Sequence, residues 1–144
     1  MSDNDDRRTL IIDAWAAAWD RGEVEALDAL LAPGYRRRSA DDPEGQDLRD
    51  FKASILATRS AFPDLTTTID EILVEGDRAA VRWHSQGRHE HSFLGVPATH
   101  RTVRVSGATF ARFVSDRVVE EFVTWDPRAL LSALGIITVG QDRG

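Results

Sequence analysis

The sequence predicts an α+β domain in which N-terminal helices pack on a curved, mainly antiparallel sheet that encloses a hydrophobic pocket. Up to Phe62, apolar residues recur at the three- and four-residue spacing of amphipathic helices. From Leu65 to Trp125 they alternate with polar residues in long runs separated by turn signals, as in antiparallel strands. A block of helices followed by a block of strands is typical of α+β domains. A chain of 144 residues is long enough for one such domain with its own core.

The helical part divides at glycine and proline residues. A first helix carries Trp15 and Trp19 on one face and ends at Gly22. A second helix is expected from Glu23 to Leu31, and a third from about Asp47 to Ala61. Between the last two, turn-forming residues predict an exposed loop over residues 35–45, with Arg36, Arg37 and Arg38 as a solvated basic cluster. The expected divisions are a disordered tail over residues 1–8, a single domain over residues 9–135 and a C-terminal tail over residues 136–144.

The strand part has four runs. They are expected at residues 65–74, 79–91, 102–114 and 118–125, with a hairpin turn at residues 75–77. A last helix begins at Pro127, since proline is tolerated at the first helical position, and it ends at Gly135.

Alternation along a strand sorts the side chains by face. Gly107 and Thr109 share one face of their strand, and Glu121, Val123 and Trp125 share one face of the last strand. We place both sets inside the domain, where the small residues leave space for a ligand. The alternative is that Gly107 and Ala111, which lie on the same face of that strand, admit Trp15 or Trp19 into a solid core. The opposite face of the strand, with Phe110 between arginines, is suited to contact with a second copy, so a homodimer is expected.

Composition excludes several classes of protein. The net charge is −6 and no basic stripe is present, which argues against a nucleic-acid partner. The chain has no cysteine, so disulfides and thiolate metal sites are excluded. No apolar run approaches the roughly 18 residues of a membrane span, and the acidic N-terminus lacks the apolar stretch of a signal peptide. A cytoplasmic protein without a membrane partner is the expectation.

Five segments together carry a resemblance to a known family. They are AFPDL (61–65), VEGDR (74–78), GRH (87–89), FLGVP (93–97) and VEEFVTWDPRALLSALG (119–135). In this order they resemble the SnoaL-like polyketide cyclase family of the nuclear-transport-factor-2-like superfamily. The resemblance runs from about Leu10 to Gly135, and it implies a cone-shaped α+β barrel and an enzyme that acts on an aromatic polyketide or a similar flat molecule without a cofactor.

The resemblance also implies part of the expected set of substrate-binding residues. Thr109 and Val123 match family positions that line the cavity, Trp19 matches an aromatic position beside the ligand, and the loop that contains Phe93 matches a lid. The expected set is Trp15, Trp19, Tyr35, Ser54, Phe93, Thr109, Val123 and Trp125.

One position departs from the family. Its ring-closing cyclases carry an acid/base aspartate three residues before the Asp of the Trp-Asp pair, and here Val123 stands there. His89, Asp126 and Glu121 are the candidates for the catalytic role. Two of them have a second interpretation: Asp126 is placed to cap the last helix, and Glu121 to pair with an arginine at the rim. His89 and His91 lack a third ligand, so no metal is expected.

Three functions therefore remain open. The first is a polyketide-tailoring enzyme that closes a ring or hydroxylates its substrate, the latter with a separate reductase as partner. The second is a protein that binds a hydrophobic metabolite without turnover. The third is a dimerisation module with a filled core, which a cavity volume would distinguish from the other two.

Overall fold

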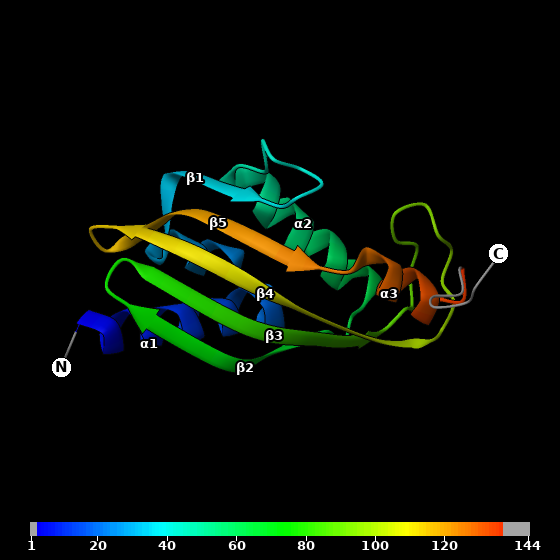
Figure 1. The fold of residues 1–144 in the computed structure, drawn as a ribbon. Helices are drawn as coiled ribbons and strands as arrows, with labels where there is room; N and C mark the ends of the chain where they lie inside the picture. Colours follow the sequence, from blue (N-terminus) through cyan, green and yellow to red (C-terminus); the bar gives the residue numbers. More distant parts are fainter. Residues whose placement is uncertain (1–2, 137–144) are drawn as a thin grey trace.

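The computed structural model describes residues 3–136, which form helices and one five-stranded sheet (Figure 1). The elements are α1 (Asp3–Trp15), η1 (Ala16–Asp20), η2 (Val24–Ala29), β1 (Leu31–Arg38), α2 (Leu48–Ala61), β2 (Thr66–Glu75), β3 (Arg78–Arg88), β4 (Thr102–Val114), β5 (Arg117–Trp125) and α3 (Pro127–Ala133). The predicted third helix, the four predicted strands and the last helix are present within a few residues of their expected bounds.

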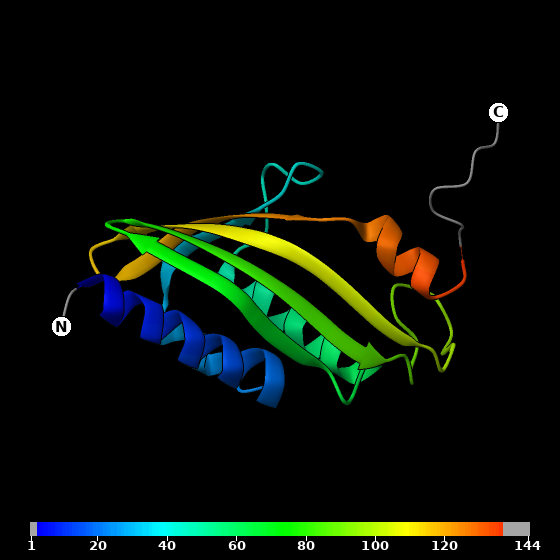
Figure 2. The ribbon, with the colours of Figure 1, turned by 60° about the horizontal axis from the view of Figure 1, so that its bottom comes forward.

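The sheet is mixed and open. Its strand order is β1-β5-β4-β3-β2, with β1 parallel to β5 and all other neighbours antiparallel. Helices α1 and α2 lie on the same face of the curved sheet, and α3 continues from the end of β5 (Figure 2). The predicted α+β class is therefore confirmed, with a sheet that does not close into a complete barrel.

The prediction for residues 31–45 was partly wrong. Residues 31–38 form strand β1, which pairs with β5, instead of the end of a helix and the start of an exposed loop. The second helix is correspondingly short, a 3-10 helix that ends at Ala29. Leu31 and Tyr35 of the strand are fully buried, and that burial stabilises an extended conformation despite the turn-forming residues between them.

The predicted disordered tail over residues 1–8 is also corrected, because α1 already begins at Asp3. Acidic residues in its first turn suit the positive end of the helix dipole. Two side chains tie this turn to the sheet. Asn4 Oδ1 accepts a hydrogen bond from the backbone N–H of Gly76, and the Arg7 guanidinium donates to the carbonyl oxygens of Gly76 and Ser115. The predicted C-terminal tail lies outside the described residues from residue 137 onward.

The predicted assignment of strand faces is confirmed. Thr109 pairs with Val123 across β4 and β5, and both are almost fully buried on the helix-covered side. Phe110 pairs with Phe122, and these side chains are 51% and 45% exposed on the other side. The alternation therefore directs Glu121, Val123 and Trp125 toward the helices.

Candidate functional site: a cavity with aromatic walls

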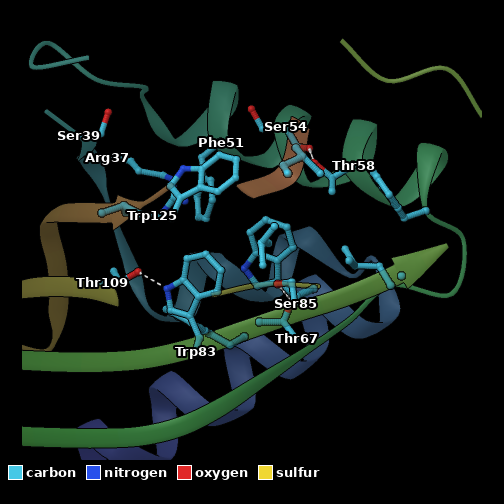
Figure 3. A pocket seen from close by; sticks show the side chains of 18 of the residues that line it. Arg37, Ser39, Phe51, Ser54, Thr58, Thr67, Trp83, Ser85, Thr109 and Trp125 are labelled. Carbon is cyan, nitrogen blue, oxygen red and sulfur yellow. Dashed lines mark hydrogen bonds between the residues drawn. The ribbon is translucent and has the colours of Figure 1, made fainter. Parts of the chain in front are cut away.

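A cavity of about 360 Å³ lies between the helix-covered face of the sheet and helix α2 (Figure 3). Side chains from both hydrophobic clusters of the core line it, one cluster around Phe51 and the other around Phe62. The volume shows that the core is not filled, which argues against a module whose only role is interaction.

Aromatic rings line several sides of the cavity. Trp15 and Trp19 come from the N-terminal helical segment, Trp83 from β3, and Trp125 from the end of β5. Trp19 meets Phe51 of α2 edge to face, with ring centroids 6.1 Å apart. Rings from opposite sides of the cavity suit a flat, apolar ligand, since aromatic surfaces contribute large contact areas in fixed geometries.

Gly107 explains how two of these rings fit. A Cβ atom at this position would lie 2.6 Å from Cζ2 of Trp83 and 2.9 Å from Cβ of Trp125. The small residue on β4 therefore accommodates Trp83 and Trp125, and not Trp15 or Trp19 as in the solid-core alternative. Space remains beside it at Thr109 and Val123, which line the cavity.

Hydroxyl and amide groups supply a few polar points. Trp83 Nε1 donates to Thr109 Oγ1 at 3.0 Å, and Gln46 Nε2 donates to Ser54 Oγ at 2.8 Å. Thr67 and Ser85 share a hydrogen bond of 2.8 Å between their hydroxyl oxygens. Groups of this kind orient a ligand in an otherwise apolar pocket.

Arg37 of β1 adds a positive charge to the lining. Its guanidinium carbon lies 4.6 Å from the ring centroid of Phe51, a cation–π contact. Behind it, Tyr35 donates a hydrogen bond from its hydroxyl to Glu121 Oε1, and the same oxygen lies 4.0 Å from Nη1 of Arg37.

Burial is the largest influence on the pKa values of both Glu121 and Tyr35. It raises the pKa of the Glu121 carboxyl above its ordinary value, while the charge of Arg37 and the Tyr35 hydrogen bond oppose the shift. The pKa of the Tyr35 hydroxyl is raised well above its ordinary value, by burial first and by the neighbouring Glu121 second. The pairing of Glu121 with an arginine, one of its two predicted interpretations, is present.

The three catalytic candidates occupy different places, and none is among the residues that line the cavity. Glu121 is buried behind the wall beside Tyr35. Asp126 is exposed and caps α3, where its Oδ1 accepts a hydrogen bond from the backbone N–H of Arg128 at 2.9 Å. Val123, at the position of the family aspartate, does line the cavity.

His89 is fully buried at the base of the loop between β3 and β4. Its Nδ1 accepts a hydrogen bond from the backbone N–H of Thr99 at 3.1 Å, and its ring stacks on Phe62 with centroids 5.2 Å apart. Phe62 in turn meets Phe93 of the loop at 5.4 Å. His89 thus holds the loop that brings Phe93, the predicted lid residue, to the cavity.

Seven of the eight predicted substrate-binding residues line the cavity: Trp15, Trp19, Ser54, Phe93, Thr109, Val123 and Trp125. Tyr35 is fully buried and does not. Arg37, Gln46, Phe51 and Trp83 also line the cavity, although their sequence patterns do not predict it. Alternation between Tyr35 and Arg37 would have placed both on one face, had β1 been recognised as a strand.

Residues 3–136 contain no cluster of three or more His, Cys, Asp or Glu side chains with metal-binding geometry. Across the same range, none of the helices is both long and apolar enough for a membrane span.

Comparison with known proteins gives a family match. The model of the SnoaL-like polyketide cyclase family matches residues 9–134, which is nearly the whole chain. No curated protein sequence matches the chain.

Solved structures of similar length share the fold. AclR of Streptomyces galilaeus, provisionally assigned as a hydroxylase, matches with a TM-score of 0.82 and 28% identity over 93% of this chain and 98% of that one. IdmH of Streptomyces antibioticus, provisionally assigned as a polyketide cyclase, gives a TM-score of 0.75 and 28% identity over 90% and 98%. A provisionally assigned polyketide cyclase from Acidithiobacillus ferrooxidans gives 0.79 and 25% over 94% and 98%.

Proposed function

The chain belongs to the SnoaL-like polyketide cyclase family, and we propose that it is an enzyme that modifies flat, aromatic polyketide-type molecules in its cavity without a cofactor. One observation carries this proposal above the others. The cavity of about 360 Å³ has tryptophan and phenylalanine rings in its walls and hydroxyl, amide and charged side chains between them, which suits a planar aromatic ligand that carries oxygen atoms.

Binding is the first part of the proposed function. A ring system inserted beside Trp19 and Phe51 makes stacked or edge contacts on its faces, and the Ser54 and Thr109 hydroxyls meet oxygen atoms at its edge. A pocket of fixed shape also holds a flexible side chain of the substrate in one conformation. Holding two reacting groups together in this way lowers the entropic part of the barrier.

Ring closure is the reaction that the family favours. A proton leaves the carbon between two carbonyl groups, the resulting enolate carbon attacks a second carbonyl of the same molecule, and the new alkoxide takes up a proton. One carbon–carbon bond forms and no atom is lost. Val123 cannot accept the proton, and Glu121 is the ionisable group nearest to it on the same strand face, with a pKa raised by burial.

Hydroxylation is the second candidate, and Val123 is the observation that favours it. A cavity without the cyclase carboxylate suits a reaction other than carboxylate-driven closure, and AclR, a provisionally assigned hydroxylase, is similar over nearly the whole chain. Here one atom of dioxygen enters a C–H bond of the substrate and the other leaves as water. The two electrons and two protons come from a separate reductase, which would be a partner of this protein.

Mass spectrometry separates these functions. The protein is incubated with aromatic polyketide keto-esters, with and without a reductant in air. Ring closure yields an isomer or its dehydrated product, and hydroxylation adds one oxygen atom. The Trp19→Ala variant should lose turnover in either case. Substrates that bind and are recovered unchanged under all conditions would instead identify a binding protein, and substrates that do not bind would overturn the proposal.

A further inference from the structure

Arg37 makes only a long ion pair, with Glu121, in the part of the chain that the structure describes. The carboxylate oxygen nearest to its guanidinium is Glu121 Oε1, 4.0 Å from Nη1, and the Tyr35 hydroxyl already donates to that oxygen. The neighbouring Arg38, which also lines the cavity, is fully engaged. Its Nε lies 3.0 Å from Glu120 Oε2, and its Nη1 donates to the carbonyl oxygens of Pro43 and Glu44.

The position of Arg37 is nevertheless fixed. Its backbone exchanges two hydrogen bonds of 2.9 Å with Gln46, which joins β1 to the segment before α2. Its guanidinium lies over the Phe51 ring, and its side chain is only 21% exposed. In Figure 3 it lies beside Phe51, toward the end of the cavity at which Trp125 also lies. A guanidinium held in this way retains little conformational freedom for a ligand to remove.

Ser54, whose partner Gln46 pairs with Arg37 through the backbone, can donate a hydrogen bond into the cavity. Ser54 Oγ accepts the hydrogen bond from Gln46 Nε2, so its own hydrogen is available to a ligand. Asp42, the carboxylate in the lining, is exposed, and its Oδ1 accepts a hydrogen bond from the backbone N–H of Gly45 at 3.1 Å. The chain as a whole carries a net charge of −6, so an arginine in the cavity lining is a local positive feature.

We propose that Arg37 anchors an anionic oxygen of the aromatic ligand, either a carboxylate or an ionised enol. The inference rests on the proposed function for its cavity and adds the charge class of the substrate. A guanidinium binds such an oxygen through charge-assisted hydrogen bonds, which are about twice as strong as neutral ones. Water exclusion by the surrounding aromatic rings strengthens the attraction further. The neighbouring Glu121 competes weakly for Arg37, because its Oε1 lies 4.0 Å from Nη1 and already accepts the hydrogen bond from the Tyr35 hydroxyl.

Two matched pairs of small ligands test this inference by calorimetry at neutral pH. The carboxylate pair is 2-naphthoate and methyl 2-naphthoate. The enol pair is 2-hydroxy-1,4-naphthoquinone, whose enol is ionised at neutral pH, and its methyl ether. The protein should bind at least one anion roughly tenfold or more tightly than its neutral partner, as expected for a hydrogen bond to a charged group. The pair that shows the preference identifies which anion the site takes.

The variants sharpen the test. Arg37→Met should abolish the preference for the anion and leave the neutral ligands at their original affinity. Arg36→Met removes the same charge from an exposed neighbouring position, and it should change neither. Equal affinity of the intact protein for anions and neutral partners would overturn this inference while leaving the proposed function intact. Because this comparison uses only the intact protein, it does not require that the variants fold. If none of the four ligands binds, the aromatic cavity is not a ligand site and both proposals fail.

Discussion

The hydroxyl of Tyr35 on β1 donates a hydrogen bond to Oε1 of Glu121 on β5, and both side chains are almost fully buried. The two strands pair in parallel although they are far apart in the sequence, and Arg37 is directly opposite Glu121 in the register. This contact therefore fixes the strand that carries Arg37 against the strand that carries Val123. The geometry of one end of the cavity depends on it.

Removal of the Tyr35 hydroxyl tests this contact. Tyr35→Phe keeps the ring but leaves Glu121 Oε1 without its donor in a buried site. We expect the free energy of unfolding to fall by about 1–3 kcal/mol, the usual cost of an unsatisfied buried polar group. Chemical denaturation measures this change. An unchanged stability would mean that water reaches Glu121.

Glu121 also predicts a pH dependence. Its pKa in the folded protein is raised above the ordinary 4.5, so the folded state holds the proton to higher pH than the unfolded chain does. As pH rises from 4.5, the unfolded chain loses the proton first, and stability falls until the folded state has lost it as well.

Glu121→Gln should remove this part of the decline, which denaturation at a series of pH values will show. Glu75→Gln, at an exposed position at the end of β2, is the matched control and should leave the slope unchanged. The account fails if the intact protein and Glu121→Gln decline with equal slopes.

Trp19→Ala tests the aromatic wall. Trp19 contacts Phe51 edge to face and lines the cavity. Its loss should weaken the binding of a planar aromatic ligand by about 1 kcal/mol or more, roughly fivefold. Quenching of tryptophan fluorescence measures the affinity. Ile12→Ala, at a 41% exposed position on α1, should bind as the intact protein does. An unchanged affinity in a folded Trp19→Ala protein would place the ligand elsewhere.

Val123→Asp tests whether the cavity retains the geometry of a ring-closing cyclase. Val123 is 3% exposed and lines the cavity, so the new carboxylate is desolvated. We expect a loss of about 1–3 kcal/mol in stability. Burial should also raise the pKa of the new carboxyl toward the working pH, where it can transfer a proton, so aldol ring closure of a keto-ester should be gained.

Thr124→Asp is the control for this change, because its side chain is exposed on the other face of β5. It should affect neither stability nor turnover. If Val123→Asp is destabilised but gains no ring closure, the cavity does not bind cyclase substrates in a reactive orientation.

We propose that the outer face of the sheet forms a homodimer contact. Phe110 and Phe122 are cross-strand partners there, 51% and 45% exposed, and adjacent aromatic side chains of this kind favour association. Sedimentation at micromolar concentration should give twice the 16.0 kDa mass of the chain, and Phe110→Asp should give the single mass. A single 16.0 kDa species for the intact protein would contradict the proposal.

The sequence predicts the antiparallel part of the fold because its signals are local. Strand alternation places Thr109 and Val123 on the inner face, and the turn at Gly76 fixes the first hairpin. Strand β1 could not be predicted in this way. Its partner β5 lies about 80 residues later in the chain, and Pro33 and Gly34 give it the composition of a turn. Parallel pairing leaves no local signal, because no hairpin joins the strands.

The same omission explains which site residues were missed. The sequence predicts a loop over residues 35–45, and a loop does not determine on which side of the sheet the Arg37 side chain lies. Arg37 is therefore expected in a solvated cluster. Trp83 lies beside Gly107, and that contact depends on a glycine whose role becomes visible only when β3 and β4 are paired. The family resemblance supplied Trp19, Thr109 and Val123 directly, and all three line the cavity.

The central claim is that the aromatic cavity binds a flat polyketide-type molecule, and a crystal structure of the protein with an aromatic keto-ester tests it most directly. We predict electron density for the ring system in contact with Trp19 and Trp125, with an oxygen of the ligand at the Arg37 guanidinium. A ligand bound on the outer face of the sheet, or an empty cavity at saturating ligand concentration, would contradict the claim.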